Sequence, residues 1–121
     1  MTNPWLIRFA PRPGASLRLF CFSYAGGGAA HYRAWLGALP EDVELCAVQL
    51  PGREGRLRET PLNSIAAIVD ALLPALRPEF DRPFVFFGHS MGAMLAFETA
   101  RALARIGATG PQRLVLSGRR A

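Results

Sequence analysis

The chain has no lysine, and all of its 14 basic residues are arginines. The excess that gives the formal charge of +5 lies entirely after Glu98, where arginines occur without acidic residues. Because no basic block with interleaved aromatic residues is present, the sequence argues against a nucleic-acid partner. Cysteine is scarce as well, and Cys21 and Cys46 each lie in an apolar run without the spacing of a metal site or a disulfide framework. We expect two buried free thiols, no metal and no other cofactor.

Long hydrophobic segments are also missing. No apolar run approaches the ~20 residues that span a bilayer, and residues 1–8 do not combine a basic start with a long apolar stretch, so we expect neither a membrane partner nor a signal peptide. Half of the 121 residues are nevertheless apolar and 19% are charged. This balance predicts a single folded domain over residues 1–121. Because the sequence shows neither a membrane span nor a signal peptide, we expect the domain in the cytoplasm.

Apolar runs and helical patterns alternate along the chain. Four nearly continuous apolar runs, typical of strands that are covered on both faces, lie at residues 17–24, 43–50, 84–87 and 114–116. Helical patterns lie at residues 32–39, 64–77 and 91–106, and residues 5–9 offer a further edge strand. Asn63 or Ser64 is expected to cap the second helix, Pro74 to kink or shorten it, and Gly107 to end the third. The order predicts an α/β fold with a mostly parallel sheet and helices on both faces.

Ser90 stands at the joint between an apolar strand and an alanine-rich helix, in the sequence Gly-His-Ser-Met-Gly. A G-x-S-x-G pattern in that setting is a nucleophile elbow, in which Gly88 and Gly92 let the backbone turn sharply and the serine hydroxyl is held above the sheet. We therefore predict that Ser90 is a nucleophile. The neighbouring His89 is expected to point away from Ser90 and to be a packed or hydrogen-bonded structural histidine.

A run of glycines follows the first long strand and includes Gly26 and Gly27. Glycines let backbone N–H groups approach a bound atom closely, as an oxyanion hole requires. One donor is expected from Met91 at the start of the third helix, and the other from Ala25 or Gly26. A plain turn is the alternative. A phosphate loop is disfavoured because neither Gly-Lys-Ser/Thr nor G-x-G-x-x-G is present.

Together, several segments resemble the type II thioesterases of polyketide and nonribosomal-peptide synthesis. They are residues 22–27, 32–35, 49–54, 88–93 with 97–98, and 117–119. The resemblance implies an α/β-hydrolase that cleaves acyl thioesters from the phosphopantetheine arm of an acyl or peptidyl carrier protein. It implies Ser90 as the nucleophile and the amides of Ala25 and Met91 as the oxyanion hole.

The sequence departs from this family in its catalytic acid and base. Elbow hydrolases place both after the serine, yet no histidine follows Ser90, and the one later carboxylate, Glu98, lies in mid-helix. His31 is the only other candidate base. We therefore expect a partial α/β-hydrolase fold that lacks the lid and the C-terminal strands, with an incomplete triad and with residues 114–116 as an uncovered apolar edge.

Two other functions stay open at this point. The arginine excess near the C-terminus suits a non-catalytic remnant that binds an acidic carrier protein. The elbow alone also suits another serine hydrolase, such as a carboxylesterase or an acyltransferase.

Overall fold

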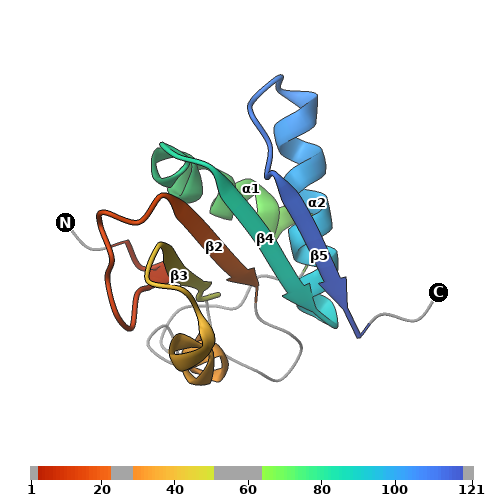
Figure 1. Ribbon diagram of the computed structural model, residues 1–121. Coiled ribbons are helices and arrows are strands. Elements are labelled where there is room, and N and C mark those ends of the chain that lie inside the picture. Colours follow the sequence, from red (N-terminus) through yellow and green to blue (C-terminus); the bar gives the residue numbers. More distant parts are fainter. Residues whose placement is uncertain (1–2, 23–28, 51–63, 119–121) are drawn as a thin grey trace.

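The protein is built around a five-stranded sheet (Figure 1). The computed structural model describes residues 3–22, 29–50 and 64–118. In chain order the strands are β1 (Leu6–Ile7), β2 (Leu17–Phe22), β3 (Val43–Val48), β4 (Phe84–His89) and β5 (Arg113–Ser117). Their order in space is β1-β3-β2-β4-β5; β1 runs antiparallel to β3, and the other neighbours are parallel. The expected mostly parallel sheet with an edge strand near residue 6 is therefore confirmed.

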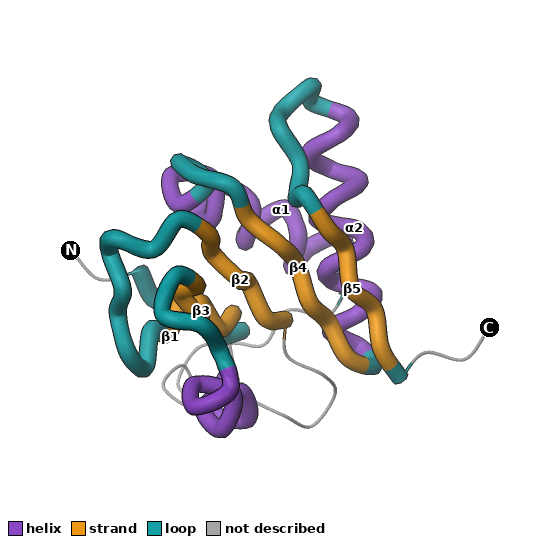
Figure 2. The backbone as a smooth tube through the Cα atoms, in the orientation of Figure 1, coloured by secondary structure: helices purple, strands orange, loops and turns teal. Residues whose placement is uncertain are grey.

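Helices cover both faces of this sheet, as the alternation of patterns predicted. The 3-10 helix η1 (Ala29–Ala38) lies on one face, and the helices α1 (Ile65–Leu76) and α2 (Met91–Arg105) lie together on the other (Figure 2). A short 3-10 turn, η3 (Arg77–Glu79), follows α1. No helix in the described ranges is long and apolar enough to cross a bilayer.

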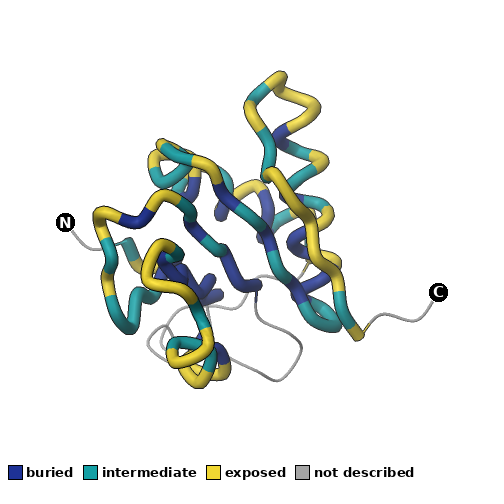
Figure 3. Tube along the Cα trace, viewed as in Figure 1, coloured by how far each residue is buried: buried dark blue, intermediate teal, exposed yellow. Residues whose placement is uncertain are grey.

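Alternate residues of the central strands supply two separate hydrophobic clusters. Phe20 and Phe22 of β2 and Phe86 of β4 pack with α1 and α2 in the larger cluster, whereas Cys21 packs with Tyr32 on the η1 face. The buried backbone concentrates in β2, β3 and β4, while β5 is largely exposed (Figure 3). Cys21 and Cys46 are buried free thiols, as expected.

The ends of α1 and α2 follow from identifiable residues. Ser64 caps α1, because its Oγ accepts a hydrogen bond from the Ala67 N–H at 3.0 Å. Pro74 lies inside α1, which continues past it to Leu76 and ends one residue earlier than predicted, where the 3-10 turn η3 begins. Gly107, at φ +71°, ends α2 with the paired hydrogen bonds of a Schellman motif.

The segment expected as a helix over residues 32–39 differs from the prediction, because it is a 3-10 helix and begins earlier, at Ala29. Residues three apart lie on the same side of a 3-10 helix. Tyr32 and Trp35 are so related, and their rings lie 5.2 Å apart with Trp35 also against Phe87 of β4 at 4.7 Å. Aromatic packing on the sheet therefore favours the tighter winding here.

The bounds of three strands, β3, β4 and β5, also differ from the prediction by one or two residues. β4 extends to His89 because Gly88 and His89 pair with residues of β5, which itself begins at Arg113 and ends at Ser117. β3 ends at Val48 rather than at residue 50, ahead of Pro51, which has no N–H for the ladder. The expected last two residues of β2 lie outside the described residues.

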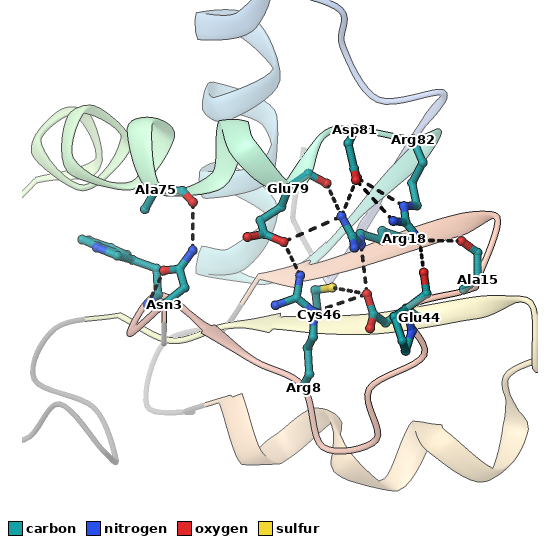
Figure 4. A network of polar contacts seen from close by, with 12 residues as sticks. Asn3, Arg8, Ala15, Arg18, Glu44, Cys46, Ala75, Glu79, Asp81 and Arg82 are labelled. Atoms are coloured by element: carbon teal, nitrogen blue, oxygen red, sulfur yellow. Dashed lines mark hydrogen bonds and ion pairs between the residues drawn. The ribbon is translucent and has the colours of Figure 1, made fainter. Parts of the chain in front are cut away.

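A network of charged side chains closes the end of the sheet where β2 and β3 begin (Figure 4). Glu44 is 1% exposed; it accepts hydrogen bonds from Arg18 Nε at 2.9 Å and the Arg12 N–H at 2.8 Å, and Arg8 Nε lies 3.2 Å away. Burial raises the pKa of Glu44, but these donors outweigh burial and hold the pKa below its ordinary value. The network lies at the opposite end of the strands from Ser90, so it serves the fold.

Candidate active site

Ser90 makes the whole turn from strand to helix by itself. β4 ends at His89 and α2 begins at Met91, so a single residue joins them. Its backbone has φ 59° and ψ −121°, and in the described part of the chain it is the one non-glycine residue with positive φ. Such a conformation costs about 1–3 kcal/mol and persists only where the surroundings enforce it. The expected strand–serine–helix arrangement is thus present, with the serine half-buried at the carboxyl end of β4.

The sharpness of this turn explains the glycine two residues earlier. A Cβ on Gly88 would lie 2.1 Å from the carbonyl oxygen of Gly92 and 2.7 Å from the backbone nitrogen of Ala93. The start of α2 therefore rests directly on the backbone of β4. Gly92 is itself buried in the first turn of α2. A close approach of the two backbones thus accounts for glycine at position 88.

The end of β5 anchors the elbow, a role that the sequence analysis did not assign. The Ser90 N–H donates a hydrogen bond to the Ser117 carbonyl at 2.9 Å, and His89 Nδ1 lies 3.3 Å from Ser117 Oγ. Gly118, at φ +73°, has the His89 ring where a Cβ would stand, at 2.2 Å. The Ser-Gly pair directly after an apolar strand was the available signal, but only the structure shows which residues it contacts.

His89 has the structural setting that was expected for it. Besides its contact with Ser117 it lines a cavity on the η1 face, together with His31, Trp35 and Phe87. The cavity has a volume of ≈ 410 Å³. Ser90, in contrast, leads into α2, which packs on the other face. His89 therefore supports the elbow through its contact with Ser117, on the face of the sheet opposite to α2.

One of the expected oxyanion donors lies in the described part of the chain, and the other lies outside it. Met91 is the first residue of α2, so its N–H belongs to the group that has no acceptor within the helix and favours an anion. The other expected donor, Ala25, and the supporting Gly26 and Gly27 lie outside the described residues.

Of the two remaining candidates for acid or base, Glu98 lies away from Ser90 along α2, and His31 lies in η1. Glu98 lies eight residues along α2, ~12 Å by the rise of a helix, and pairs with Arg101 at 2.9 Å. His31 is exposed in the first turn of η1, with its ring 5.0 Å from that of Tyr32. No cluster of three or more potential metal ligands occurs within the described ranges. Of the predicted site residues, the structure thus places Ser90 and Met91 together at the start of α2.

Of the arginines near the C-terminus, those that the structure describes lie away from this serine. Arg105 ends α2 and Arg113 begins β5, so both lie at the end of the sheet opposite to the elbow. Arg101 is already paired with Glu98. Arg119 and Arg120 lie outside the described residues. The described arginines therefore do not form a basic surface around Ser90.

A mostly parallel sheet flanked by helices, with a one-residue turn at a serine after a central strand, defines the class of α/β-hydrolases. Comparison with known proteins places the chain within that class. The family model described as "Thioesterase domain" matches residues 17–121. The chain belongs to the thioesterase domain family, and the family resemblance seen in the sequence is confirmed.

Similar proteins come from secondary metabolism and from fatty-acid synthesis. The gramicidin S biosynthesis protein GrsT of Aneurinibacillus migulanus is 42% identical over 119 residues, which cover 98% of this chain and 46% of that protein. The human medium-chain S-acyl fatty acid synthase thioesterase is 42% identical over 106 residues, or 87% of this chain and 40% of that protein.

Solved structures give the same result. The type II thioesterase BorB from the borrelidin biosynthetic cluster has a TM-score of 0.82 and 38% identity, over 90% of this chain and 44% of that one. YbtT, a type II thioesterase from the yersiniabactin pathway, has a TM-score of 0.81 and 36% identity, over 94% and 47%. The chain thus spans about half the length of the relatives it matches.

Proposed function

We propose that this chain forms the nucleophile-bearing part of a type II thioesterase, which hydrolyses acyl thioesters on the phosphopantetheine arm of an acyl or peptidyl carrier protein. Ser90 attacks the thioester carbonyl, and its hydroxyl proton passes to a base. The negative charge that forms on the carbonyl oxygen is stabilised by the N–H groups of Met91 and Ala25. The thiol of the arm then leaves, and water hydrolyses the acyl-serine.

The observation that carries this proposal is the backbone of Ser90. A strained conformation at a serine between strand and helix is costly, and its surroundings are built to keep it: Gly88 makes room for α2, and Ser117 accepts the serine N–H. The same turn directs the N-terminus of α2 toward the reacting atoms, where its dipole favours an oxyanion.

The test must account for the base, because removal of one triad member costs ~10⁴-fold or more in rate. The chain is incubated with an acyl thioester in buffered imidazole, which supplies a diffusible base, and acylation is located by mass spectrometry. We expect an acyl group on Ser90 that is lost in Ser90→Ala. Ser16→Ala, which removes an exposed serine at the other end of the sheet, serves as the matched control and should label normally.

Two results would contradict the proposal. One is thioester cleavage that Ser90→Ala leaves unchanged. The other is no acyl-Ser90 under conditions in which the 42% identical gramicidin S biosynthesis protein becomes acylated. The matching oxygen ester is assayed in parallel, since faster reaction with it would instead indicate a carboxylesterase or an acyltransferase.

A further inference from the structure

Tyr32 carries a hydroxyl into the interior of the protein. Its side chain is fully buried between η1 and the sheet, and a buried hydroxyl costs free energy unless it makes a hydrogen bond. This one donates to the carbonyl oxygen of Phe22, the last residue of β2. A phenylalanine ring would fill the same space without a polar group to satisfy. The distinctive feature of position 32 is therefore the bond from its hydroxyl to the end of β2.

The Phe22 carbonyl belongs to the end of the sheet at which Ser90 lies. In the residues that the structure describes, β2 pairs with β3 as far as Cys21, and with β4 one residue further, where Phe22 lies opposite Gly88. The last residue of a strand opens more readily than the residues inside the ladder. The Tyr32 hydroxyl therefore ties the end of β2 to η1.

The Tyr32 ring also reaches β4. It lies 6.1 Å from the ring of Phe87, at an interplanar angle of 86°, which is the edge-to-face arrangement that aromatic pairs favour. Phe87 lies three residues before Ser90 in the chain. Phe22 lies three residues before Ala25, an expected oxyanion donor. One buried side chain thus contacts both of the strands that lead to the proposed catalytic groups.

We propose that Tyr32 is a positioning residue, whose hydroxyl fixes the end of β2 relative to β4. That this spacing aligns an oxyanion donor with Ser90 rests on the proposed function, and it applies whether the donor is the amide of Ala25 or that of Gly26. Donors act only within hydrogen-bond distance of the developing charge, and a displacement of about 1 Å can cost about 10²-fold in rate. The hydroxyl should therefore affect the rate of acylation, although its own side chain is buried.

The test compares Tyr32→Phe with Thr99→Val as the matched control. Thr99 is also fully buried, and its Oγ1 donates to the Leu95 carbonyl at 2.7 Å, within α2 and more than two helical turns beyond Ser90. Each substitution removes one buried hydroxyl that bonds to a backbone carbonyl and leaves a side chain of nearly the same shape. Circular dichroism and urea unfolding confirm that both variants are folded under the conditions of the assay.

The first readout is hydrogen exchange of the backbone amides, which needs no enzymatic activity. In Tyr32→Phe the amides of residues 20–22 and 86–88 should exchange at least about threefold faster, because the loss of one hydrogen bond lets the strand ends open more often. In Thr99→Val these amides should exchange as they do in the unmodified chain.

The second readout is acylation of Ser90 in buffered imidazole, measured over a range of thioester concentrations. Tyr32→Phe should lower the limiting rate at least about tenfold and leave the half-saturating concentration unchanged, because a misplaced oxyanion donor acts on the transition state. Thr99→Val should change neither quantity. Replacing Tyr32 with 4-aminophenylalanine, whose N–H can donate to the same carbonyl, should restore most of the limiting rate, which a purely structural role would not predict.

The outcomes also separate this inference from the proposed function. Exchange at the two strand ends that Tyr32→Phe leaves unchanged, or that Thr99→Val accelerates equally, would overturn the positioning role, and so would a normal acylation rate in Tyr32→Phe. Faster exchange in a chain whose Ser90 is not acylated, under conditions in which the gramicidin S biosynthesis protein is, supports the positioning of the strand ends and contradicts the proposed function. Faster exchange together with slower acylation, both reversed by 4-aminophenylalanine, supports both.

Discussion

Replacing Gly88 with alanine tests the geometry of the elbow most directly. The added Cβ would lie 2.1 Å from the Gly92 oxygen and 2.4 Å from its carbonyl carbon, whereas unstrained contacts lie near 3.5 Å or beyond, so one backbone must retreat by more than about 1 Å. The start of α2 has little freedom to do so, because the Ala93 N–H donates to the Ser90 carbonyl at 3.0 Å and the Ser90 N–H donates to Ser117.

The expected loss of stability follows from these contacts. Overpacking of a rigid interior costs about 1–3 kcal/mol, and the loss of one of the two hydrogen bonds adds about 1 kcal/mol. Gly88→Ala should therefore lower the free energy of unfolding by about 3 kcal/mol, which corresponds to a fall in Tm of roughly 10 °C for a domain of this size. That is a large share of the 5–15 kcal/mol that typically stabilises a domain.

The measurement is urea unfolding followed by tryptophan fluorescence, with Gly37→Ala as the matched control. Nothing lies within 4 Å of a Cβ at Gly37, so there the substitution should add about 0.5–1 kcal/mol by restricting the unfolded chain. If Gly88→Ala unfolds at the same urea concentration as the unmodified protein, α2 does not rest on β4 as described, and the account of the elbow is wrong.

Three further predictions follow from other parts of the fold. Gly118→Ala should destabilise the protein by at least about 1 kcal/mol more than Gly107→Ala. Both positions have a positive φ, but only a Cβ at position 118 would meet the His89 ring. Thermal melts of the two variants isolate the effect of that clash, and equal losses of stability would refute it. Glu44→Gln should cost about 3 kcal/mol at pH 7. Because the pKa of Glu44 is held below its ordinary value, the ionised carboxylate stabilises the fold above about pH 4.3, and this contribution is lost as pH falls through the lowered pKa. The stabilities of the two proteins, measured by urea titration, should therefore converge in acid. A difference in stability that is independent of pH would count against the network. Burial raises the pKa of Cys46 to about 12 and that of Cys21 further still. Neither thiol should therefore be alkylated by iodoacetamide at pH 7 before urea is added. Rapid labelling of the folded protein would show that the sheet opens.

The elements that the sequence predicted are those for which local pattern and tertiary packing agree. Ser64 and Gly107 bound their helices as expected, since a cap depends on hydrogen bonds within a few residues. The winding of η1 was missed because it depends on Phe87, which is more than fifty residues away from Tyr32 and Trp35 in the chain. Helical propensity alone does not distinguish the two helix types there.

In the candidate site, too, the locally encoded feature was predicted and the one that depends on distant residues was not. The position of Ser90 between strand and helix is encoded in the consecutive residues 84–97, and so it was predicted. The support from Ser117 and Gly118 depends on β5 lying beside β4 in a particular register, with Ser117 opposite His89. No local pattern states a register between parallel strands that are joined by a helix. The anchoring of the elbow therefore became visible only with the sheet assembled.

The charged network and the strained serine lie at opposite ends of the sheet. Where β2 and β3 begin, a buried carboxylate is matched by three arginine donors, and no described non-glycine residue at this end has a positive φ. Where β4 ends, Ser90 holds a conformation that costs free energy, and one of its supports comes from β5, the edge strand of the sheet in the part of the chain that the structure describes. A strained residue needs surroundings that are stable without it. The charged network and the two apolar clusters supply that stability at a distance from Ser90, so the end of the sheet that carries the serine can hold the strained turn.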